Sequence, residues 1–519
     1  MHFDKKRILV GLTGIVLVGL LLNAASHYHL RQIVDRLAFS RDILMYVWIQ
    51  FGIVLIVYRE RVFQILREFF SAETHPVNLA IFRIIVFSTV VAGVKPEKIA
   101  FFGHIPKELL FSPPGYEHLI HFIPLSPDVL FVAASLLILF GWMAAIGLLT
   151  RFSTWCTAFL AIYVLGIPQL FGKIDHYHFL IWFALILASS PCGDALSVDA
   201  MIDRVWKKKE KRFIGPSVCY ALPIRFAWIL IGILYFFPGF WKFWVGGVDW
   251  FLSDNLKYRM YFKWAELDGW LPFFRLDQYP IFYKFGAFWT IVFEMTFIFL
   301  IFSPKTRYLA VLEGLTFHGF TNLFMKISFI SLVKCYVVFF DWYKIYSNVL
   351  QKLGIKFTKE QTFSAKQETP RKVSRSLIVT AIVLIVSNIY CGFGAYGGID
   401  TWPIACYPTF ANVMRAPYKA VMEVITVDAS GKEHSPDLKK IYQQIGTSRY
   451  WGMIQSILYT AEAGERKKKQ RAFLSLWARF DPMIEQAEKI RLYSTVVGTA
   501  PDRNQGQEQE RTLLTEIVL

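Results

Sequence analysis

Long apolar runs, repeated along 519 residues and joined by short polar loops, constrain this chain more than any other feature. A helix that crosses a bilayer needs about 20 mostly apolar residues. Because the bilayer core offers no water to backbone polar groups, such runs fold as helices. The sequence predicts an all-α polytopic membrane protein with about 11 transmembrane helices. Their expected ranges are 8–25, 42–58, 78–93, 127–148, 153–170, 177–191, 222–239, 283–303, 308–324, 327–343 and 376–393.

The composition supports a membrane protein and excludes several other classes. Hydrophobic residues make up 55% of the chain and charged residues 18%, whereas soluble domains hold roughly 45–50% and about 25%. Disordered, collagen-like and disulfide-scaffold proteins are excluded. A net charge of +17 would suggest nucleic-acid binding in a soluble chain. Here much of the basic charge lies in loops between apolar runs, so no nucleic-acid partner is expected.

The first apolar run has two interpretations. Lys5, Lys6 and Arg7 precede it, and small residues end it near Ala24–Ser26. This is the outline of a retained membrane helix and also of a cleaved signal peptide. Both alternatives leave the orientation of the later helices unchanged.

Basic loops set the expected orientation. Lys and Arg accumulate in cytoplasmic loops, and the sequence has two strongly basic loops, Val205–Arg212 and Lys344–Arg375. With both in the cytoplasm, the N-terminus is cytoplasmic and the C-terminal tail is extracytoplasmic. The expected parts are an N-terminal helix pair (1–74), a membrane domain (75–393) and a small α+β domain (394–519).

The tail contains signals for a small folded domain. Lys419–Val427 is typical of a strand, and Asp428–Gly431 of a turn. Arg449–Ala463 and Arg471–Gln486 are expected to be helices, and the chain from Ala500 is expected to be loose.

The cysteine pattern gives no metal site. Six cysteines show no CxxC and no metal-ligand spacing. Cys391 and Cys406 are expected near the external face, where a disulfide and a pair of free thiols both remain open.

Ionisable residues inside apolar runs are costly and point to function, although many only pair or extend to the membrane surface. Three of them are expected at one depth near the external face: His176, Lys242 and His318. A lysine among aromatic side chains loses solvation and can act as a base, and two nearby histidines could relay a proton. The full set is Arg83, Asp175, His176, His178, Arg225, Lys242, Glu294, Glu313, His318 and Lys334.

An ordered set of motifs resembles a known family. The set starts with HPVNLAIFRIIVF from His75, FSPPG and IGLLTRFS. It continues with Asp175-His176, SSPCGDALSVD (Ser189–Asp199), YFFPGFWK (Tyr235–Lys242), Glu294 and FHGFTNLF (Phe317–Phe324). In this order the motifs resemble the membrane domain of vitamin K-dependent gamma-carboxylases, the horizontally transferred transmembrane (HTTM) domain. The resemblance covers about residues 75–393 and implies a nine-helix core preceded by two extra helices.

The resemblance implies a chemistry and a set of site residues. The carboxylases use a reduced vitamin K-like quinone, O2 and CO2, without a metal, to carboxylate glutamate side chains. The family's catalytic lysine falls on Lys242, and its two functional histidines fall on His176 and His318. Glu294, Asp175, Trp241 and Arg83 are then expected to bind the quinone or to support the structure.

The chain departs from the carboxylases at three places. Trp241 stands where the family has a first lysine, and Met414–Ala416 replaces a histidine-rich segment. The large propeptide-binding part is missing. The expected function is therefore a quinol-dependent enzyme acting on an extracytoplasmic peptide or small molecule. The alternative is a non-catalytic membrane factor for maturation or export of a secreted peptide. The third possibility is a transporter. Transporters are expected to have interrupted helices at the membrane midplane, and this sequence contains few such interruptions.

Overall fold

The structure is a computed structural model of the whole chain. It describes residues 33–205, 215–267, 269–353, 372–406, 410–481 and 487–518, with the isolated positions 11, 13–14, 16–19 and 484. Most of the expected first helix (8–25), nearly all of the basic run Val205–Arg212 and most of the loop Lys344–Arg375 lie outside these residues.

Six helical segments in the described part of the chain are long and apolar enough to cross a membrane. They include α2 (Ile33–Val57), α6 (Pro127–Ile146), α10 (Val218–Gly246), α13 (Pro280–Leu300) and α17 (Arg375–Gly394). The sixth joins α7 (Thr150–Val164) to a short 3₁₀ turn that ends at Leu170. α4 (Pro76–Ala92) and α5 (Pro96–Phe101) add a seventh when counted as one segment bent by 53°.

Three expected spans differ from the structure. The run 177–191 forms α8 (His178–Ala188), which has only 11 residues and is followed directly by a turn. The run 327–343 forms α15 (Ile330–Cys335) and a 3₁₀ turn to Phe339. α14 (Pro304–Met325) has 22 residues but is too polar to be counted among the six. α8 is short yet almost entirely buried, because neighbouring helices surround it.

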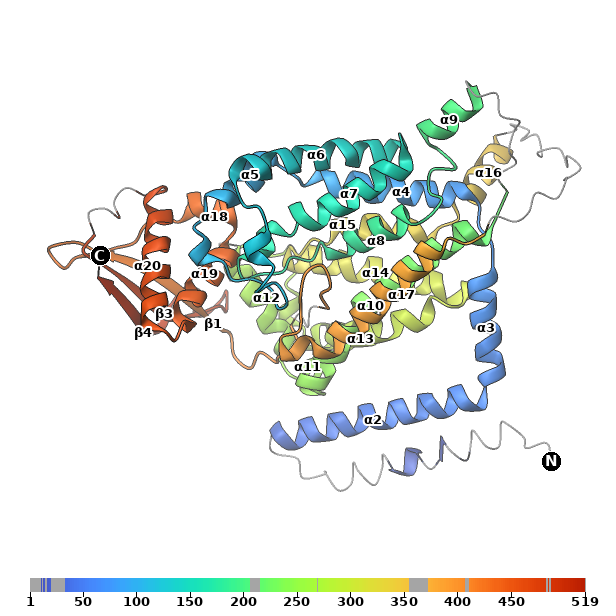
Figure 1. Ribbon diagram of the computed structural model, residues 1–519. Helices are drawn as coiled ribbons and strands as arrows, with labels where there is room; N and C mark the ends of the chain where they lie inside the picture. Colours follow the sequence, from blue (N-terminus) through green and yellow to red (C-terminus); the bar gives the residue numbers. More distant parts are fainter. Residues whose placement is uncertain are drawn as a thin grey trace, which may run out of the picture.

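α10 lies at the centre of the helix bundle (Figure 1). It packs against α13, α17, α8, α2, α3 and α4. Two glycines let α13 approach its backbone closely. A Cβ at Gly232 would lie 2.9 Å from Ile298 Cβ, and a Cβ at Gly239 would lie 2.7 Å from Glu294 Cβ. Small residues at a helix contact permit such an approach, which brings the polar residues of α10 and α13 together.

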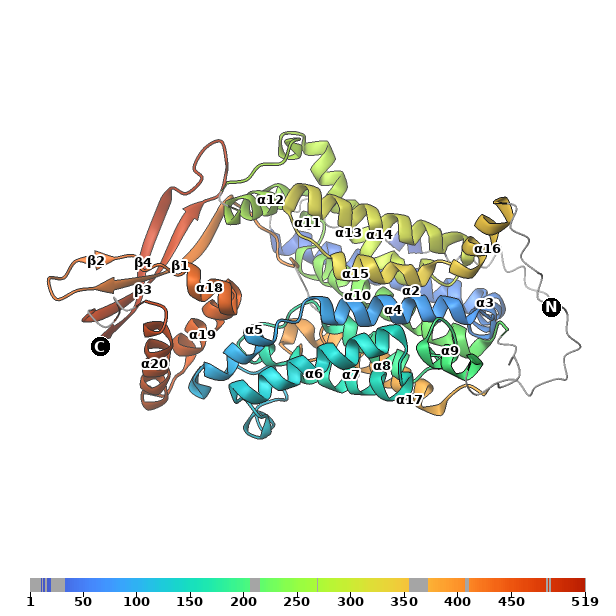
Figure 2. The ribbon, with the colours of Figure 1, turned by 90° about the horizontal axis from the view of Figure 1, so that it is seen from above.

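The remaining helices lie at the two ends of the bundle. α3 (Arg59–Ser71) runs across one end, where α9 and α16 also lie (Figures 1 and 2). The C-terminal domain lies at the opposite end. The bounds of the other bundle elements are α9 Val198–Val205, α11 Asp249–Leu252, α12 Asn255–Glu266 and α16 Trp342–Lys352.

The C-terminal domain holds an antiparallel sheet with the order β2-β1-β3-β4. The strand predicted at Lys419–Val427 is confirmed as β1, and the turn at Asp428–Gly431 follows it. The helix predicted at Arg471–Gln486 begins earlier, as α20. The expectation of a loose end from Ala500 is wrong, because β4 continues the sheet. The bounds are β1 Tyr418–Val427, β2 Glu433–His434, α18 Lys439–Ile445, α19 Thr447–Tyr459, α20 Ala463–Ala478, β3 Lys489–Gly498 and β4 Glu508–Val518.

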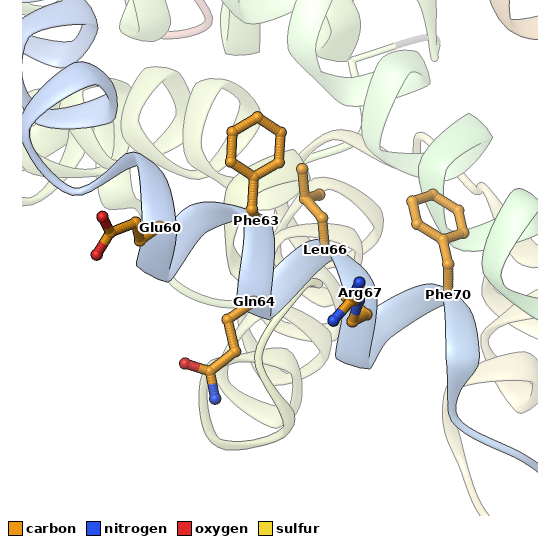
Figure 3. Close-up of a pocket in the computed structure, with 6 residues that line it drawn as sticks. All are labelled: Glu60, Phe63, Gln64, Leu66, Arg67 and Phe70. Carbon is orange, nitrogen blue, oxygen red and sulfur yellow. The ribbon is translucent and has the colours of Figure 1, made fainter.

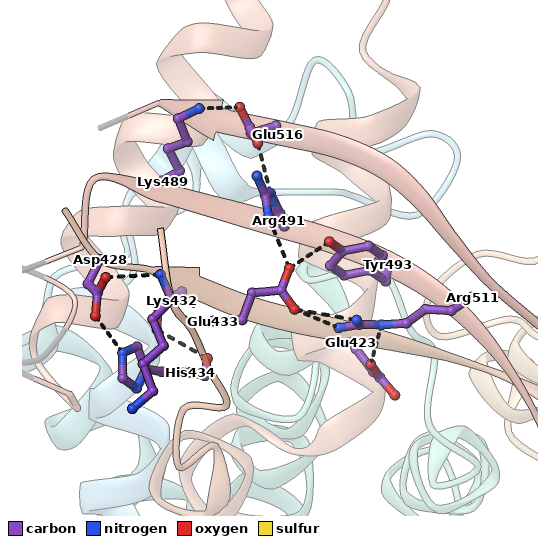
Figure 4. A network of polar contacts seen from close by, with 11 residues as sticks. Glu423, Asp428, Lys432, Glu433, His434, Lys489, Arg491, Tyr493, Arg511 and Glu516 are labelled. Atoms are coloured by element: carbon purple, nitrogen blue, oxygen red, sulfur yellow. Dashed lines mark hydrogen bonds and ion pairs between the residues drawn. The ribbon is translucent and has the colours of Figure 1, made fainter. Parts of the chain in front are cut away.

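Charged side chains form a network of hydrogen bonds and ion pairs on one face of this sheet (Figure 4). Glu433 accepts hydrogen bonds from Arg491 at 3.1 Å and from Tyr493 at 2.8 Å. Glu516 on β4 pairs with Lys489 and Arg491 on β3 at 3.0 and 2.8 Å. These cross-strand pairs stabilise a polar edge strand that shows little apolar alternation.

Candidate functional site

A buried ion pair joins α10 to α13. Lys242 Nζ lies 2.7 Å from Glu294 Oε1 and 2.6 Å from Oε2. Both residues are 4% exposed. The ammonium also lies 5.8 Å from the centre of the Trp250 ring. Gly239 creates the space for this pair, because a side chain there would collide with Glu294.

A second polar group lies on the same face of α10. Tyr235 Oη is 2.5 Å from His318 Nε2 and 2.6 Å from Tyr336 Oη. The rings of Phe293 and Phe297 pack at 4.9 Å from the Tyr235 ring. His318 Nδ1 is buried and has no hydrogen-bond partner among the described residues. Buried polar atoms are nearly always paired, so this nitrogen marks a place where a further polar atom would fit.

The two groups are neighbours along α10. Residues seven apart point to nearly the same side of a helix and are about 10 Å apart along its axis. Tyr235 and Lys242 have this spacing. On α13, Phe293 contacts Tyr235 while the adjacent Glu294 pairs with Lys242. The structure therefore assembles one polar stripe between α10, α13 and α14.

The predicted histidines approach each other through one aromatic ring. The centre of the His318 ring lies 5.0 Å from that of Phe329, and the His176 ring lies 6.3 Å from it. His176 is half-buried just before α8. The structure thus brings His176 and His318 against Phe329, while Lys242 lies further along α10 with Glu294.

Asp175 and Trp241 have structural contacts. Asp175 forms an ion pair with Arg449 of α19, which ties the C-terminal domain to the segment before α8. Trp241 donates a hydrogen bond of 2.8 Å to the carbonyl of Gly392 and stacks on Tyr396.

Arg83 joins segments of the bundle. It is fully buried and donates hydrogen bonds of 2.6 Å to the carbonyls of Cys192 and Leu196, with longer ones to Ala145 and Ala195. These carbonyls follow α8 or end α6. Arg83 therefore neither extends to the membrane surface nor touches the polar stripe.

Sequence reasoning missed two tyrosines of the site. Tyr235 lies within the motif YFFPGFWK and Tyr336 within a short apolar helix, so each has the pattern of a core residue. The Tyr235 hydroxyl meets His318, and the Tyr336 hydroxyl meets that of Tyr235, only after their helices pack together. His178, which the sequence singled out, is buried with Nδ1 3.3 Å from the Asp175 carbonyl and with Nε2 unpaired.

No metal site is found in the described part of the chain, where no group of three His, Cys, Asp or Glu side chains converges. The six cysteines form no disulfide with one another. Cys406 Sγ lies 3.2 Å from the Asn388 carbonyl, so the disulfide alternative with Cys391 is not formed.

Surface hollows lie along α3 and beside α2. One has a volume of about 750 Å³ and lies along α3 (Figure 3). The other, of about 200 Å³, is lined by Thr13, Val16, Leu17, Tyr46, Val47 and Gln50.

Comparison of the chain with protein-family models, curated proteins and solved structures gave no significant match. The resemblance to the carboxylase membrane domain stays a prediction from the motifs.

Proposed function

We propose that this chain is a multi-pass integral membrane protein, with a cytoplasmic N-terminus and an extracytoplasmic C-terminal domain. The long apolar helices support membrane insertion, and the basic loops support the orientation. The polar stripe then lies toward the external end, since Lys242 is four residues from the end of α10.

We propose further that the polar stripe deprotonates a lipid-soluble quinol, as the resemblance to the carboxylases implies. The observation that carries this proposal is the buried pair of Lys242 and Glu294. In apolar surroundings, moving a proton from the ammonium to the carboxylate removes two costly charges. The resulting neutral amine has the lone pair that a base needs.

The surrounding residues suit an aromatic, weakly acidic molecule. The unpaired Nδ1 of His318 would hold a hydroxyl oxygen, while Tyr235 and Tyr336 fix the orientation of the imidazole. Phe293, Phe317 and Phe329 give the site apolar walls. A bound quinol would supply the oxidisable ring that reacts with O2, and CO2 is the co-substrate implied by the resemblance.

The substrate of such an enzyme would be an extracytoplasmic peptide or small molecule. The C-terminal domain is held at the same end of the bundle by the pair Asp175–Arg449. In this proposal it would present a secreted peptide to the external end of α10.

One observation favours a second candidate, a non-catalytic membrane factor for maturation or export of a secreted peptide. Both oxygens of Glu294 engage Lys242, so the pair is already satisfied within the protein. A saturated ion pair can serve helix packing alone.

Lys242→Arg separates the two candidates. Arginine keeps the charge and the pairing with Glu294 but does not release its proton at physiological pH. We expect loss of quinol oxidation by the detergent-purified protein, with expression and melting temperature preserved. His318→Ala should lower the rate by about 10²–10⁴-fold, the usual contribution of a positioned proton-transfer group.

The matched control is Lys257→Arg, on α12 near the same end of the bundle, which should leave the rate unchanged. Full activity of Lys242→Arg would refute the role of Lys242 as a base. Absence of quinol-dependent turnover in the wild-type protein would favour the non-catalytic factor.

A further inference from the structure

Two arginines pack on neighbouring aromatic rings beside α3, at the end of the bundle opposite the C-terminal domain. Arg225 comes from α10 and Arg307 from the first turn of α14. The guanidinium carbon of Arg225 lies 5.5 Å from the centre of the Phe69 ring, and that of Arg307 lies 4.0 Å from the Trp228 ring. The Phe69 and Trp228 rings are 5.9 Å apart, so one aromatic cluster supports both cations.

We infer that Arg225 and Arg307 bind the phosphate of an anionic lipid headgroup at this end of the bundle. The inference is independent of the proposed quinol chemistry, because the pair lies at the other end of α10.

Among the described residues, each arginine of this pair donates to one backbone carbonyl. Each guanidinium carries five N–H donors. Arg225 donates to the Ala72 carbonyl at 2.7 Å, and Arg307 donates to the Ile301 carbonyl at 3.1 Å. No carboxylate among the described residues pairs with either arginine, and the two cations repel each other. Arg225 is only 7% exposed, and a buried charge without a counter-ion is costly.

A phosphate has the chemistry to satisfy this pair. The planar fork of arginine matches phosphate oxygens with two parallel hydrogen bonds. α14 begins at Pro304, three residues before Arg307, and the positive end of its helix dipole favours an anion there. The exposed Lys305 adds a further positive charge beside it.

The adjacent hollow indicates a lipid as the source of the phosphate. It follows α3 and is lined by Glu60, Phe63, Gln64, Leu66, Arg67 and Phe70. Phe63, Leu66 and Phe70 point one way in Figure 3, and Gln64 points the other way. Phe63 is 69% exposed. The Phe70 ring lies 6.4 Å from that of Phe226, the residue after Arg225. An acyl chain in this hollow would lie along the same helix whose Phe69 contacts Arg225.

The position of α3 agrees with this role. It lies across the helix ends (Figures 1 and 2), as expected of an amphipathic helix in the membrane interface. Under the proposed orientation this end faces the cytoplasm, and the cytoplasmic leaflet carries the anionic lipids.

The test is lipid-dependent melting of the full-length protein in nanodiscs. Wild-type protein should melt at a higher temperature in discs with phosphatidic acid than in phosphatidylcholine discs, because a ligand of the native state stabilises it. The double variant Arg225→Gln/Arg307→Gln should lose most of this difference. The matched control Arg59→Gln/Arg61→Gln removes the same charge from exposed positions of α3 and should keep it.

Native mass spectrometry gives a second measurement if the double variant does not fold. Arg307→Gln alone should lower retention of phosphatidic acid by about tenfold, the cost of removing one charge-assisted contact. Equal retention by wild type and Arg307→Gln would overturn the inference. An equal rise in melting temperature with inorganic phosphate alone would also overturn the assignment to a lipid. If the Arg59→Gln/Arg61→Gln control lost the lipid-dependent difference in melting temperature to the same extent, general surface charge would explain the effect and the inference would be overturned.

Discussion

At the residue scale, the site depends on close backbone contact at Gly239. The glycine allows Glu294 to reach Lys242 with both oxygens at 2.7 and 2.6 Å. Burying two charges is expensive, and only their mutual attraction and good geometry offset the loss of water. The pair therefore contributes little to the free energy of unfolding, but removing one partner should lower that free energy strongly.

Glu294→Gln should destabilise the protein by about 3–5 kcal/mol, because it leaves the Lys242 ammonium buried and unpaired. Replacing both residues, as Lys242→Met/Glu294→Met, should recover most of the loss. The measurement is the melting temperature of the purified protein in detergent.

Glu313→Gln is the control for this prediction. Glu313 is also buried, and its Oε2 has no hydrogen-bond partner, so neutralising its carboxyl group should cost little. A similar fall in melting temperature for Glu313→Gln and Glu294→Gln would show that the ion pair has no special role.

At the element scale, the polar face of the C-terminal sheet links its strands. Glu433 on β2 reaches Tyr493 and Arg491 on β3, and it also pairs with Arg511 on β4 (Figure 4). The hydrogen bond from Tyr493, and then that from Arg491, hold the pKa of Glu433 below its usual value of 4.5. One carboxylate thus connects β2 to two strands with which β2 does not pair directly.

The sheet should lose stability in acid. A carboxylate whose pKa is lowered on folding stabilises the native state above its unfolded pKa and loses this effect as the pH falls through its folded pKa. The contribution of Glu433 should be complete at pH 7 and decline below pH 4.5. Glu433→Gln should remove it, at a cost of about 0.2–1 kcal/mol, typical of an exposed pair.

Hydrogen exchange of β1 and β3 amides, corrected for intrinsic rates, measures this effect in the full-length protein. Glu510→Gln on β4 is the control, because Glu510 is exposed and, within the described part of the chain, its carboxylate is hydrogen-bonded only to Thr512. An identical pH dependence for wild type and Glu433→Gln would contradict the prediction.

At the scale of the whole molecule, chemically different regions occupy opposite ends of the bundle. The sheet domain lies at one end, and α3, α9 and α16 lie at the other (Figures 1 and 2). The polar stripe with Lys242, the proposed quinol site, belongs to the first end and the arginine pair to the second. Because one helix, α10, carries residues of both, the orientation of the bundle fixes the compartment of each.

Cysteine labelling in intact cells should show this orientation. Ser430→Cys, in the exposed turn after β1, should react with a membrane-impermeant thiol reagent, and Lys305→Cys, at the start of α14, should not. Both variants need a background in which Cys156, the least buried native cysteine, is replaced by serine. Labelling of Lys305→Cys without labelling of Ser430→Cys would reverse the proposed topology.

The sequence alone determined the long apolar helices. A run of about 20 apolar residues is a local property, and α6, α10, α13 and α17 appear where such runs predict them. β1 and its turn followed from local alternation and turn residues in the same way. Local patterns did not predict the short lengths of α8 and α15, because a helix that is buried among other helices need not be as long as the bilayer is thick.

Only the tertiary structure decided which polar groups meet. Lys242 and Glu294 are 52 residues apart, and Tyr235 and His318 are 83 apart, so no spacing in the sequence joins them. β4 was unexpected because its charged residues are stabilised by β3 rather than by an apolar face. Asp175 likewise forms its ion pair with Arg449, which is 274 residues away in the sequence and is brought close by packing. Which polar side chains pair in a folded chain depends on their distance in space and on their burial. The order of residues along the sequence does not contain this information.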